Sequence, residues 1–216
     1  VYKRQLDGDA DRVVFSDEKG NIIDCDQILG VLALDLYNHK QLKNNTVVGT
    51  IMTNIGFENF LNDNNINLKR VNVGDRYILD EMLNNNYNLG GEPSGHVIMS
   101  DYTKSGDGLM TAIKIISLLK KSGKKASEYL RPFSITPYKI KNLKKINNNI
   151  LETESIKKSL KKIQFDLKIK HNGRLLVRPS GTEPIVRILV ECENDGKIDH
   201  YISKVQDLLV KENFFE

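Results

Sequence analysis

Three carboxylates at alternate positions give the segment Asp7-Gly8-Asp9-Ala10-Asp11-Arg12 its chemical character. The residues between them are small, so the backbone can bend tightly and the carboxylates can turn their oxygens toward one point. Mg²⁺ prefers hard oxygen ligands, and it keeps waters or a substrate phosphate in its remaining coordination positions. The sequence therefore predicts a Mg²⁺ site formed by Asp7, Asp9 and Asp11.

Two alternatives compete with a Mg²⁺ site in this segment. An acidic surface turn is common, but Arg12 and the apolar run at 13–15 indicate a strand that leaves a shaped loop. A calcium-binding EF-hand would place Glu18 at its twelfth position, yet it requires glycine at the sixth, where Arg12 stands. The six residues before Asp7 are also too few for the entering helix. We therefore favour Mg²⁺.

A second segment, Arg178-Pro179-Ser180-Gly181-Thr182-Glu183-Pro184, has the composition of an anion-binding loop and is followed by Arg187. Guanidinium groups, hydroxyls and free backbone N–H groups are the donors that suit a phosphate dianion. A β-turn with incidental hydroxyl groups is the alternative, because such turns are frequent. The donors that would contact phosphate are Arg178, Ser180, Gly181, Thr182 and Arg187.

A third loop, Gly90-Gly91-Glu92-Pro93-Ser94-Gly95-His96, contains three glycines and a proline, which predicts an exposed turn. Glu92, Ser94 and His96 offer a carboxylate, a hydroxyl and an imidazole, which could hydrogen-bond sugar hydroxyls or be ordinary loop residues. The usual pKa of histidine lies near neutrality, so an acid–base role for His96 stays open.

The elements around these loops indicate an α/β protein. A strand at 12–16 is followed by a helix that Asp26 caps and that runs to about His39, and a polar break at 43–45 marks a boundary. Strands at 47–52 and 68–73 then alternate with helices at 56–61 and 75–83, which predicts parallel strands. A helix at 107–119 ends this part.

The last part of the chain has a different order. A strand at 135–140 and a helix at 152–163 precede three short strands at 167–171, 174–178 and 185–191, and a helix at 198–210 follows. Strands grouped between two helices predict a small α+β domain. We therefore expect three parts: 1–44 as the end of one α/β domain, 45–133 as a complete α/β domain, and 134–216 as the α+β domain.

Composition indicates a globular, cytoplasmic protein. Of the 216 residues, 39% are hydrophobic and 28% charged, and no apolar run or signal peptide indicates a membrane or export. The two distant cysteines fit a reducing compartment. The net charge of +4 comes from residues 137–216, which hold 16 basic and 11 acidic side chains. Lys157-Lys158 and Lys161-Lys162 have the pattern of a solvated helix face, so we do not expect nucleic acid as a partner. Because no apolar run reaches membrane-spanning length, we do not expect a membrane partner either.

Taken together, and in this order, the three loops resemble those of the α-D-phosphohexomutases. The resemblance covers nearly the whole chain. Within that family the chain is most similar to the bacterial phosphoglucosamine mutases, because of Val73-Gly74-Asp75-Arg76-Tyr77, Gly90-Gly91-Glu92 and Ser105-Gly106-Asp107-Gly108. The resemblance implies conversion of glucosamine 6-phosphate to glucosamine 1-phosphate through a bisphosphorylated sugar, which supplies UDP-N-acetylglucosamine and cell-wall precursors. A phosphorylated serine would donate and recover the phosphoryl group beside Mg²⁺.

The resemblance also implies a role for each loop. Asp7, Asp9 and Asp11 would bind the metal, Arg12 would lie beside the transferring phosphoryl group, Glu92 and Ser94 would contact the sugar hydroxyls, and Arg178, Ser180, Gly181, Thr182 and Arg187 would bind the phosphate that does not react. The family's first domain, with its serine loop, has no counterpart in these 216 residues. We therefore expect a fragment that covers the end of domain two and all of domains three and four, inactive by itself.

The expected partners are a hexosamine phosphate and the missing amino-terminal domains, and a homodimer stays open. Three alternatives remain. The first is a phosphomannomutase or phosphoglucomutase of the same family. The second is a non-catalytic sugar-phosphate-binding protein. The third, a nucleic-acid-binding module, rests on the basic last segment alone and ranks below the others.

Overall fold

The computed structural model describes residues 3–144, 146, 148–180 and 185–213. The chain divides into two compact units, Val1–Ile135 and Thr136–Glu216. The first unit carries residues 7–12, which we call the acidic loop, and residues 90–96, which we call the Glu92 loop. The second unit carries Arg178 and Arg187.

A three-stranded antiparallel sheet opens the first unit. Strand β1 (Lys3–Leu6) pairs with β2 (Val13–Ser16), which pairs in turn with β3 (Ile22–Ile23). The acidic segment is therefore the connection between β1 and β2. The sequence pattern predicts no strand before this segment, but residues 3–6 form one. These residues lack the apolar pattern of a buried strand. The reason is that β1 lies at the edge of the sheet, where it pairs only with β2.

Helix α1 (Cys25–Asn38) follows, and its first turn corrects a predicted cap. Asp24 is the N-cap, and its side chain accepts a hydrogen bond from the Asp26 backbone N–H. The sequence predicts Asp26 in that role, but Asp26 is buried in the first turn of the helix. Its Oδ2 accepts a hydrogen bond of 2.7 Å from the backbone N–H of Asn54, the N-cap of α2 (Ile55–Asp63). Asp26 therefore ties two helix starts together.

The central sheet of the first unit has the strand order β5-β4-β6-β7. Strands β4 (Thr46–Thr50), β5 (Asn67–Val71) and β6 (Leu89–Gly91) are parallel, and β7 (Val97–Met99) is antiparallel to β6. A short 3₁₀ helix, η1 (Lys43–Asn45), precedes β4. The predicted α/β layer with parallel strands is confirmed.

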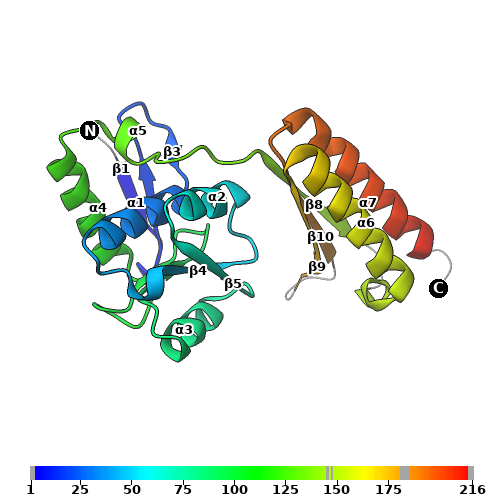
Figure 1. Cartoon of the computed structure of the whole chain (residues 1–216), viewed down its shortest axis with the longest axis horizontal. Helices are drawn as coiled ribbons and strands as arrows, with labels where there is room; N and C mark the ends of the chain where they lie inside the picture. The colour runs from blue at the N-terminus through cyan, green and yellow to red at the C-terminus, as the bar shows by residue number, and fades with distance from the viewer. Residues whose placement is uncertain (1–2, 145, 147, 181–184, 214–216) are drawn as a thin grey trace. The chain divides into compact units, whose positions relative to one another are not determined.

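Helices cover both faces of this sheet (Figure 1). Helix α3 (Asp75–Asn84) packs on one face, where Ile78 and Met82 contact Val48 and Ile98. Helices α1 and α2 cover the other face, and α4 (Gly108–Ser122) packs against α1. A short helix, α5 (Ala126–Tyr129), follows α4. The core on this side contains residues from the first 44 positions and from later ones, so the expected boundary at 44 and 45 lies inside one compact unit.

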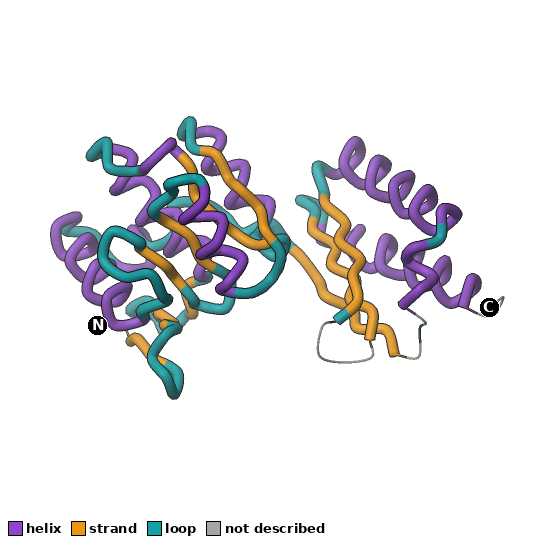
Figure 2. The backbone as a smooth tube through the Cα atoms, turned by 90° about the horizontal axis from the view of Figure 1, so that it is seen from below, coloured by secondary structure: helices purple, strands orange, loops and turns teal. Residues whose placement is uncertain are grey.

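The second unit is a three-stranded antiparallel sheet with two long helices on one face (Figure 2). The strand order is β8-β10-β9, with β8 (Tyr138–Lys144), β9 (Arg174–Pro179) and β10 (Ile185–Glu191). Helices α6 (Glu154–His171) and α7 (Ile198–Asn213) supply the helical layer, and η2 (Asn148–Glu152) and η3 (Asp195–Lys197) precede them.

The strand predicted at 167–171 is wrong, because α6 continues through it to His171. Ile163 and Leu167 lie four positions apart and are both buried in the core of this unit. That spacing places them on one helical face. The helix ends where Asn172 adopts a left-handed conformation, with φ of 46°.

Candidate functional site

The acidic loop is a tight turn that gathers its three carboxylates. The Ala10 N–H donates to the Asp7 carbonyl oxygen at 3.2 Å, and the Arg12 N–H donates to Asp7 Oδ1 at 3.2 Å. Ala10 takes a left-handed conformation with φ of 60°, which costs energy for a residue with a Cβ. Carboxylate oxygens of Asp7, Asp9 and Asp11 lie within 4.8 Å of one another. The turn thus brings the predicted metal ligands together.

The charges of this loop favour a cation among the carboxylates. Arg12 Nε lies 2.6 Å from Asp7 Oδ2 and 3.6 Å from Asp11 Oδ1, and the two carboxylates raise the pKa of Arg12. Asp11 Oδ1 is buried and has no hydrogen-bond partner among the described residues. A buried carboxylate oxygen without a donor is costly unless a cation satisfies it. Together with the convergence of the three carboxylates, this oxygen makes the loop suitable for Mg²⁺, which prefers hard oxygen ligands.

The Glu92 loop packs directly on the acidic loop. The Val13 N–H donates to the Gly95 carbonyl oxygen at 3.1 Å, and Arg12 and His96 form an isolated antiparallel bridge. His96 Nδ1 lies 3.0 Å from Asp11 Oδ2. Burial alone raises the pKa of Asp11, but hydrogen bonding with His96 and the adjacent charges lowers it overall. Two loops that are far apart in sequence therefore form one site.

The position of His96 corrects the expectation of an imidazole on an exposed turn. The residue is only 5% exposed, and its Nε2 is buried without a hydrogen-bond partner among the described residues. Within the loop, Pro93 and Ser94 are exposed. The reason is the pairing of β6 with β7, which folds the glycines and His96 inward and leaves the tip outside.

Glu92, which is half-buried, and the exposed Ser94 lie next to each other at this tip. The Ser94 hydroxyl donates to Glu92 Oε2 at 3.3 Å, and the Gly74 N–H donates to Glu92 Oε1 at 2.9 Å. A cavity of about 160 Å³ beside them is lined by Gln5, Leu6, Asp7, Arg12, Val14 and Ser94. The acidic loop and the Glu92 loop thus share one hollow that contains a carboxylate, a guanidinium and a hydroxyl.

Two glycines that support the site received no role from the sequence. A Cβ at Gly106 would clash with the His96 ring, and a Cβ at Gly108 would lie 2.7 Å from the Arg12 carbonyl oxygen. The Gly108 N–H, at the start of α4, donates to the Ala10 carbonyl oxygen at 2.9 Å. The signal was present in Ser105-Gly106-Asp107-Gly108, where two glycines flank the helix-capping Asp107.

The second unit brings together two of the predicted phosphate-binding residues. Arg178 on β9 and Arg187 on β10 are directly opposite each other in the antiparallel register. Burial and the charge of Arg187 lower the pKa of Arg178. The Ser180 N–H donates to the Ile185 carbonyl oxygen at 2.9 Å, which closes the hairpin, while Gly181 and Thr182 lie outside the described residues. Two adjacent guanidinium groups repel each other and favour an anion.

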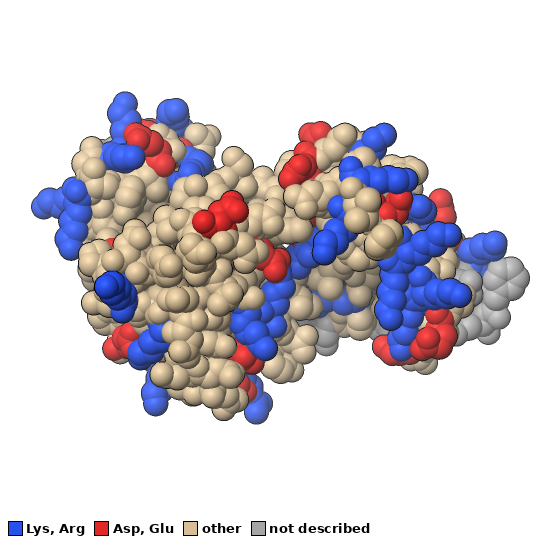
Figure 3. Space-filling model, in the orientation of Figure 1, with Lys and Arg blue, Asp and Glu red and all other residues tan. Residues whose placement is uncertain are grey.

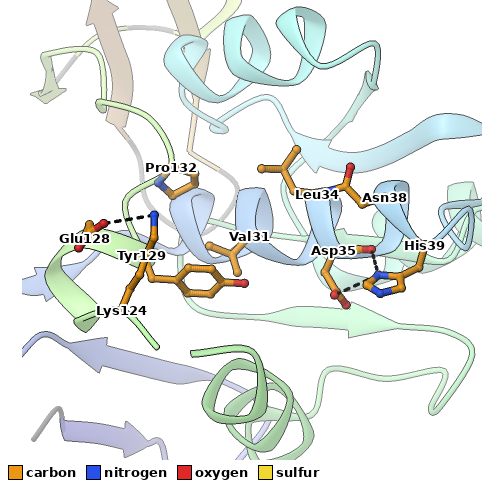
Figure 4. Close-up of a pocket in the computed structure, with 9 residues that line it drawn as sticks. All are labelled: Val31, Leu34, Asp35, Asn38, His39, Lys124, Glu128, Tyr129 and Pro132. Carbon is orange, nitrogen blue, oxygen red and sulfur yellow. Dashed lines mark hydrogen bonds and ion pairs between the residues drawn. The ribbon is translucent and has the colours of Figure 1, made fainter. Parts of the chain in front are cut away.

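A larger hollow in the first unit carries no comparable chemistry. It has a volume of about 340 Å³ between α1 and the segment that includes α5 (Figure 4). Its charged side chains are paired within it: His39 Nδ1 lies 3.3 Å from Asp35 Oδ1, and Lys124 Nζ lies 3.2 Å from Glu128 Oε1. We therefore place the candidate site at the smaller cavity.

No helix among the described residues has the length and apolar character needed to cross a membrane.

Comparisons with known proteins identify the family of the chain. The phosphoglucomutase/phosphomannomutase α/β/α domain III pattern matches residues 24–134, and the C-terminal domain pattern of the same family matches 137–208. The chain is 44% identical over 210 residues to the phosphoglucosamine mutase of Caldanaerobacter subterraneus and 40% identical over 200 residues to that of Rhizobium johnstonii. These matches cover 96% and 93% of this chain but only 46% and 44% of the relatives. The chain thus spans about half their length.

Solved structures show the same fold. The N-acetylphosphoglucosamine mutase of Aspergillus fumigatus superposes with a TM-score of 0.82 at 18% identity, over 97% of this chain and 48% of that one. A structure of the Aspergillus enzyme in complex with GlcNAc-6P and magnesium has a TM-score of 0.78 at 19% identity, over 94% of this chain and 51% of that one. The loop sequences, the two domain matches and the fold lead to one conclusion: the chain belongs to the phosphoglucomutase/phosphomannomutase family, the α-D-phosphohexomutases.

Proposed function

We propose that this chain supplies the metal-binding, sugar-binding and phosphate-binding parts of a phosphoglucosamine mutase. The observation that supports this most is the 160 Å³ cavity, because Asp7 and Arg12 of the acidic loop line it together with Ser94 of the Glu92 loop. A hexosamine phosphate has hydroxyl, amino and phosphate groups, and this hollow offers an acceptor, a cation and a hydroxyl within one small space. The curated relatives at 40–44% identity are phosphoglucosamine mutases.

In this proposal Asp7, Asp9 and Asp11 hold Mg²⁺. When it is bound, the ion neutralises negative charge on the transferring phosphoryl group. Arg12 already lies against two of these carboxylates, so its guanidinium is positioned to contact a phosphoryl oxygen beside the metal. The contact with His96 holds the Asp11 carboxylate in one orientation. His96 is then a positioning residue rather than an acid–base catalyst.

The remaining roles are assigned by chemistry. Glu92 and Ser94 contact the sugar hydroxyls, because they are polar groups at the tip of this loop, where Ser94 is exposed and Glu92 is half-buried. Arg178 and Arg187 bind the phosphate that does not react, together with Ser180, Gly181 and Thr182. Arginine can hold a phosphate through two parallel hydrogen bonds, which fixes its orientation as well as its distance.

The reaction proposed for the whole protein is the interconversion of glucosamine 6-phosphate and glucosamine 1-phosphate. The phosphoserine donor would come from a part of the protein outside these residues. We place the enzyme in the cytoplasm, where it would supply UDP-N-acetylglucosamine for cell-wall precursors. A homodimer is compatible with this proposal.

Calorimetry with the 216-residue chain tests the metal assignment. Mg²⁺ is titrated into the wild-type chain and into Asp9→Asn, which keeps the size of the side chain but removes one charge. Asp9 is exposed, so the variant should fold normally. We expect the variant to bind Mg²⁺ more weakly, and equal affinity in the two proteins would overturn the metal site.

A second titration, in the presence of Mg²⁺, tests the sugar. Glucosamine 6-phosphate, glucose 6-phosphate and mannose 6-phosphate are compared, and we expect glucosamine 6-phosphate to bind most tightly. Preference for either other sugar would favour a phosphoglucomutase or phosphomannomutase of the same family. Joining the chain to the amino-terminal half of a curated relative and measuring turnover distinguishes a mutase from a non-catalytic binding protein.

A further inference from the structure

Helix α6 carries on its outer surface a stripe of four lysines and two large apolar residues. The stripe consists of Lys158, Lys161, Lys162, Phe165, Lys168 and Ile169, which we call the α6 stripe. At about 100° per residue, these positions fall within roughly one third of the helix circumference. All six are exposed, and Figure 3 shows Lys and Arg gathered on the part of the surface that α6 occupies in Figure 1.

The two apolar residues lie at the centre of the stripe. Phe165 and Ile169 are four positions apart, so they are neighbours on the helix, and each is 68% exposed. The buried face of α6, with Ile156, Ile163 and Leu167, points in the opposite direction. Phe165 and Ile169 therefore contribute nothing to the core of this unit. The lysines alone would indicate a solvated helix face. Two large apolar side chains exposed among them indicate instead that this face binds a partner.

The lysines of the stripe are not engaged in ion pairs among the described residues. Lys157 and Lys170, which flank the stripe on the same helix, contact Glu152 at 2.9 Å and Asp166 at 2.7 Å. By contrast, no described carboxylate lies within 4.0 Å of the Nζ atoms of the four stripe lysines. Four lysines without an ion pair among the described residues thus surround two exposed apolar side chains, and the one carboxylate on the same side of α6 is that of Glu154 in its first turn.

We propose that the α6 stripe binds the surface of a membrane that contains acidic lipids. An interfacial helix places apolar side chains at the boundary between headgroups and acyl chains, and its lysines reach sideways to the headgroups. Acidic headgroups complement the four charges, while the central Phe165 and Ile169 enter the boundary. This is peripheral binding, so it requires no membrane-spanning segment.

The pattern favours a lipid surface over nucleic acid. Proteins that bind nucleic acid combine aromatic stacking with arginine and polar contacts. The stripe contains no arginine, and Ile169 cannot stack on a base. A second copy of this surface is also disfavoured, because the lysines would repel each other. The inference is independent of the proposed mutase function, because no residue of the stripe belongs to the candidate site.

The chain contains no tryptophan, so Phe165→Trp introduces a single fluorescent reporter at the centre of the stripe. The 216-residue protein is mixed with vesicles of phosphatidylcholine alone or with one third phosphatidylglycerol. We expect a blue shift of the emission with the acidic vesicles and none with the neutral ones. Tyr102→Trp, at a 60% exposed position in the first unit, is the matched reporter that should not shift. A blue shift in the Tyr102→Trp protein, or none in the Phe165→Trp protein, would overturn the proposal.

Co-sedimentation with the same vesicles tests the lysines. Lys158→Gln/Lys161→Gln and Lys157→Gln/Lys170→Gln remove the same charge from the same helix, but only the first pair belongs to the stripe. Each lysine near an acidic surface contributes a factor of roughly five. The stripe variant should therefore lose about 25-fold in vesicle affinity, and the control variant much less. Equal losses in the two variants would show a general charge effect and overturn the proposal. Binding to homopolymeric RNA without binding to acidic vesicles would also overturn it.

Discussion

His96 Nδ1 lies 3.0 Å from Asp11 Oδ2, so a buried imidazole of the Glu92 loop holds a carboxylate of the acidic loop. The contact joins residues 85 positions apart in the chain. It makes the geometry of the proposed metal site depend on the hairpin formed by β6 and β7.

Replacement of His96 should weaken Mg²⁺ binding without removing a ligand. His96→Ala deletes the partner of Asp11, and groups that orient metal ligands typically contribute roughly 10- to 100-fold in affinity. His96→Asn places an amide near the position of Nδ1, so it should restore part of the affinity. Calorimetry with Mg²⁺ measures both variants. If the alanine and asparagine variants both bind as tightly as wild type, the contact has no positioning role.

Gly106→Ala should have a similar effect from a different segment. The added Cβ would overlap the His96 ring, so the imidazole must shift away from Asp11. We expect weaker Mg²⁺ binding and a lower melting temperature. Gly8→Ala is the matched control, because a Cβ at Gly8 meets nothing within 4 Å and should leave both quantities nearly unchanged. The opposite ranking of the two variants would contradict this packing argument.

Arg178→Lys should weaken binding of a sugar phosphate and leave the fold intact. Lysine keeps the charge but cannot form two parallel hydrogen bonds to one phosphate. A charge-assisted hydrogen bond contributes roughly 1.5–3 kcal/mol, so we expect a loss of about tenfold or more. The measurement is titration of glucosamine 6-phosphate, with circular dichroism as the folding control. Unchanged affinity would show that Arg178 does not bind phosphate and that the hairpin between β9 and β10 is an ordinary turn.

Asp17 should make the first unit sensitive to acid. Burial alone would raise the pKa of Asp17, but the hydrogen bond of 2.6 Å from Arg131 and those from the Lys19 and Asn21 backbone lower it to about 2. Because the pKa is lower in the folded state than the ordinary value of 3.8, the stabilisation is present above that pH. It is lost as the pH falls through about 2.

Thermal melts at several pH values measure this contribution. Asp17→Asn should melt several degrees below wild type at neutral pH, and the difference should shrink as the pH approaches 2. Asp80→Asn, on the exposed side of α3, should show little difference at any pH. A constant gap between Asp17→Asn and wild type across the range would show that the carboxylate charge is not the cause.

The 216 residues expressed by themselves should have no mutase activity. Phosphoryl transfer requires a positioned donor, and no residue here matches the serine loop of the family. The assay supplies glucosamine 6-phosphate, Mg²⁺ and the 1,6-bisphosphate activator, after circular dichroism has verified folding. Formation of glucosamine 1-phosphate above background would mean that a nucleophile is present in this sequence.

Much of the architecture could be predicted from the sequence, because its signals are local. The alternating strands and helices between Thr46 and Asn84 follow their apolar periodicity closely. The errors arose where tertiary contacts decide. Residues 167–171 alternate like a strand, but Leu167 completes the buried face of α6 together with Ile163. Lys3–Leu6 lacks an apolar pattern, yet it forms a strand because β2 provides a partner.

In the candidate site, too, local features could be predicted from the sequence and tertiary contacts could not. The spacing of the three aspartates predicted that their carboxylates converge, because the geometry lies within five residues. The burial of His96 could not be predicted, since it depends on Asp11 and on the missing side chain of Gly106. Glycine motifs show that something approaches closely, but they do not show what approaches.

The β2–β3 hairpin is fastened at both of its ends. At one end, the Gly95 carbonyl oxygen accepts a hydrogen bond from the Val13 N–H, and the Gly108 N–H donates one to the Ala10 carbonyl oxygen of the acidic loop. At the other end, Arg131 binds Asp17, and Ser127 binds Glu18 through its backbone and its hydroxyl. Strand β2 spans only roughly 13 Å between these attachments. The segment around Ser127 and Arg131 therefore stabilises the same four-residue strand that leads out of the acidic loop, so the integrity of the proposed metal site depends on residues more than a hundred positions away in the chain.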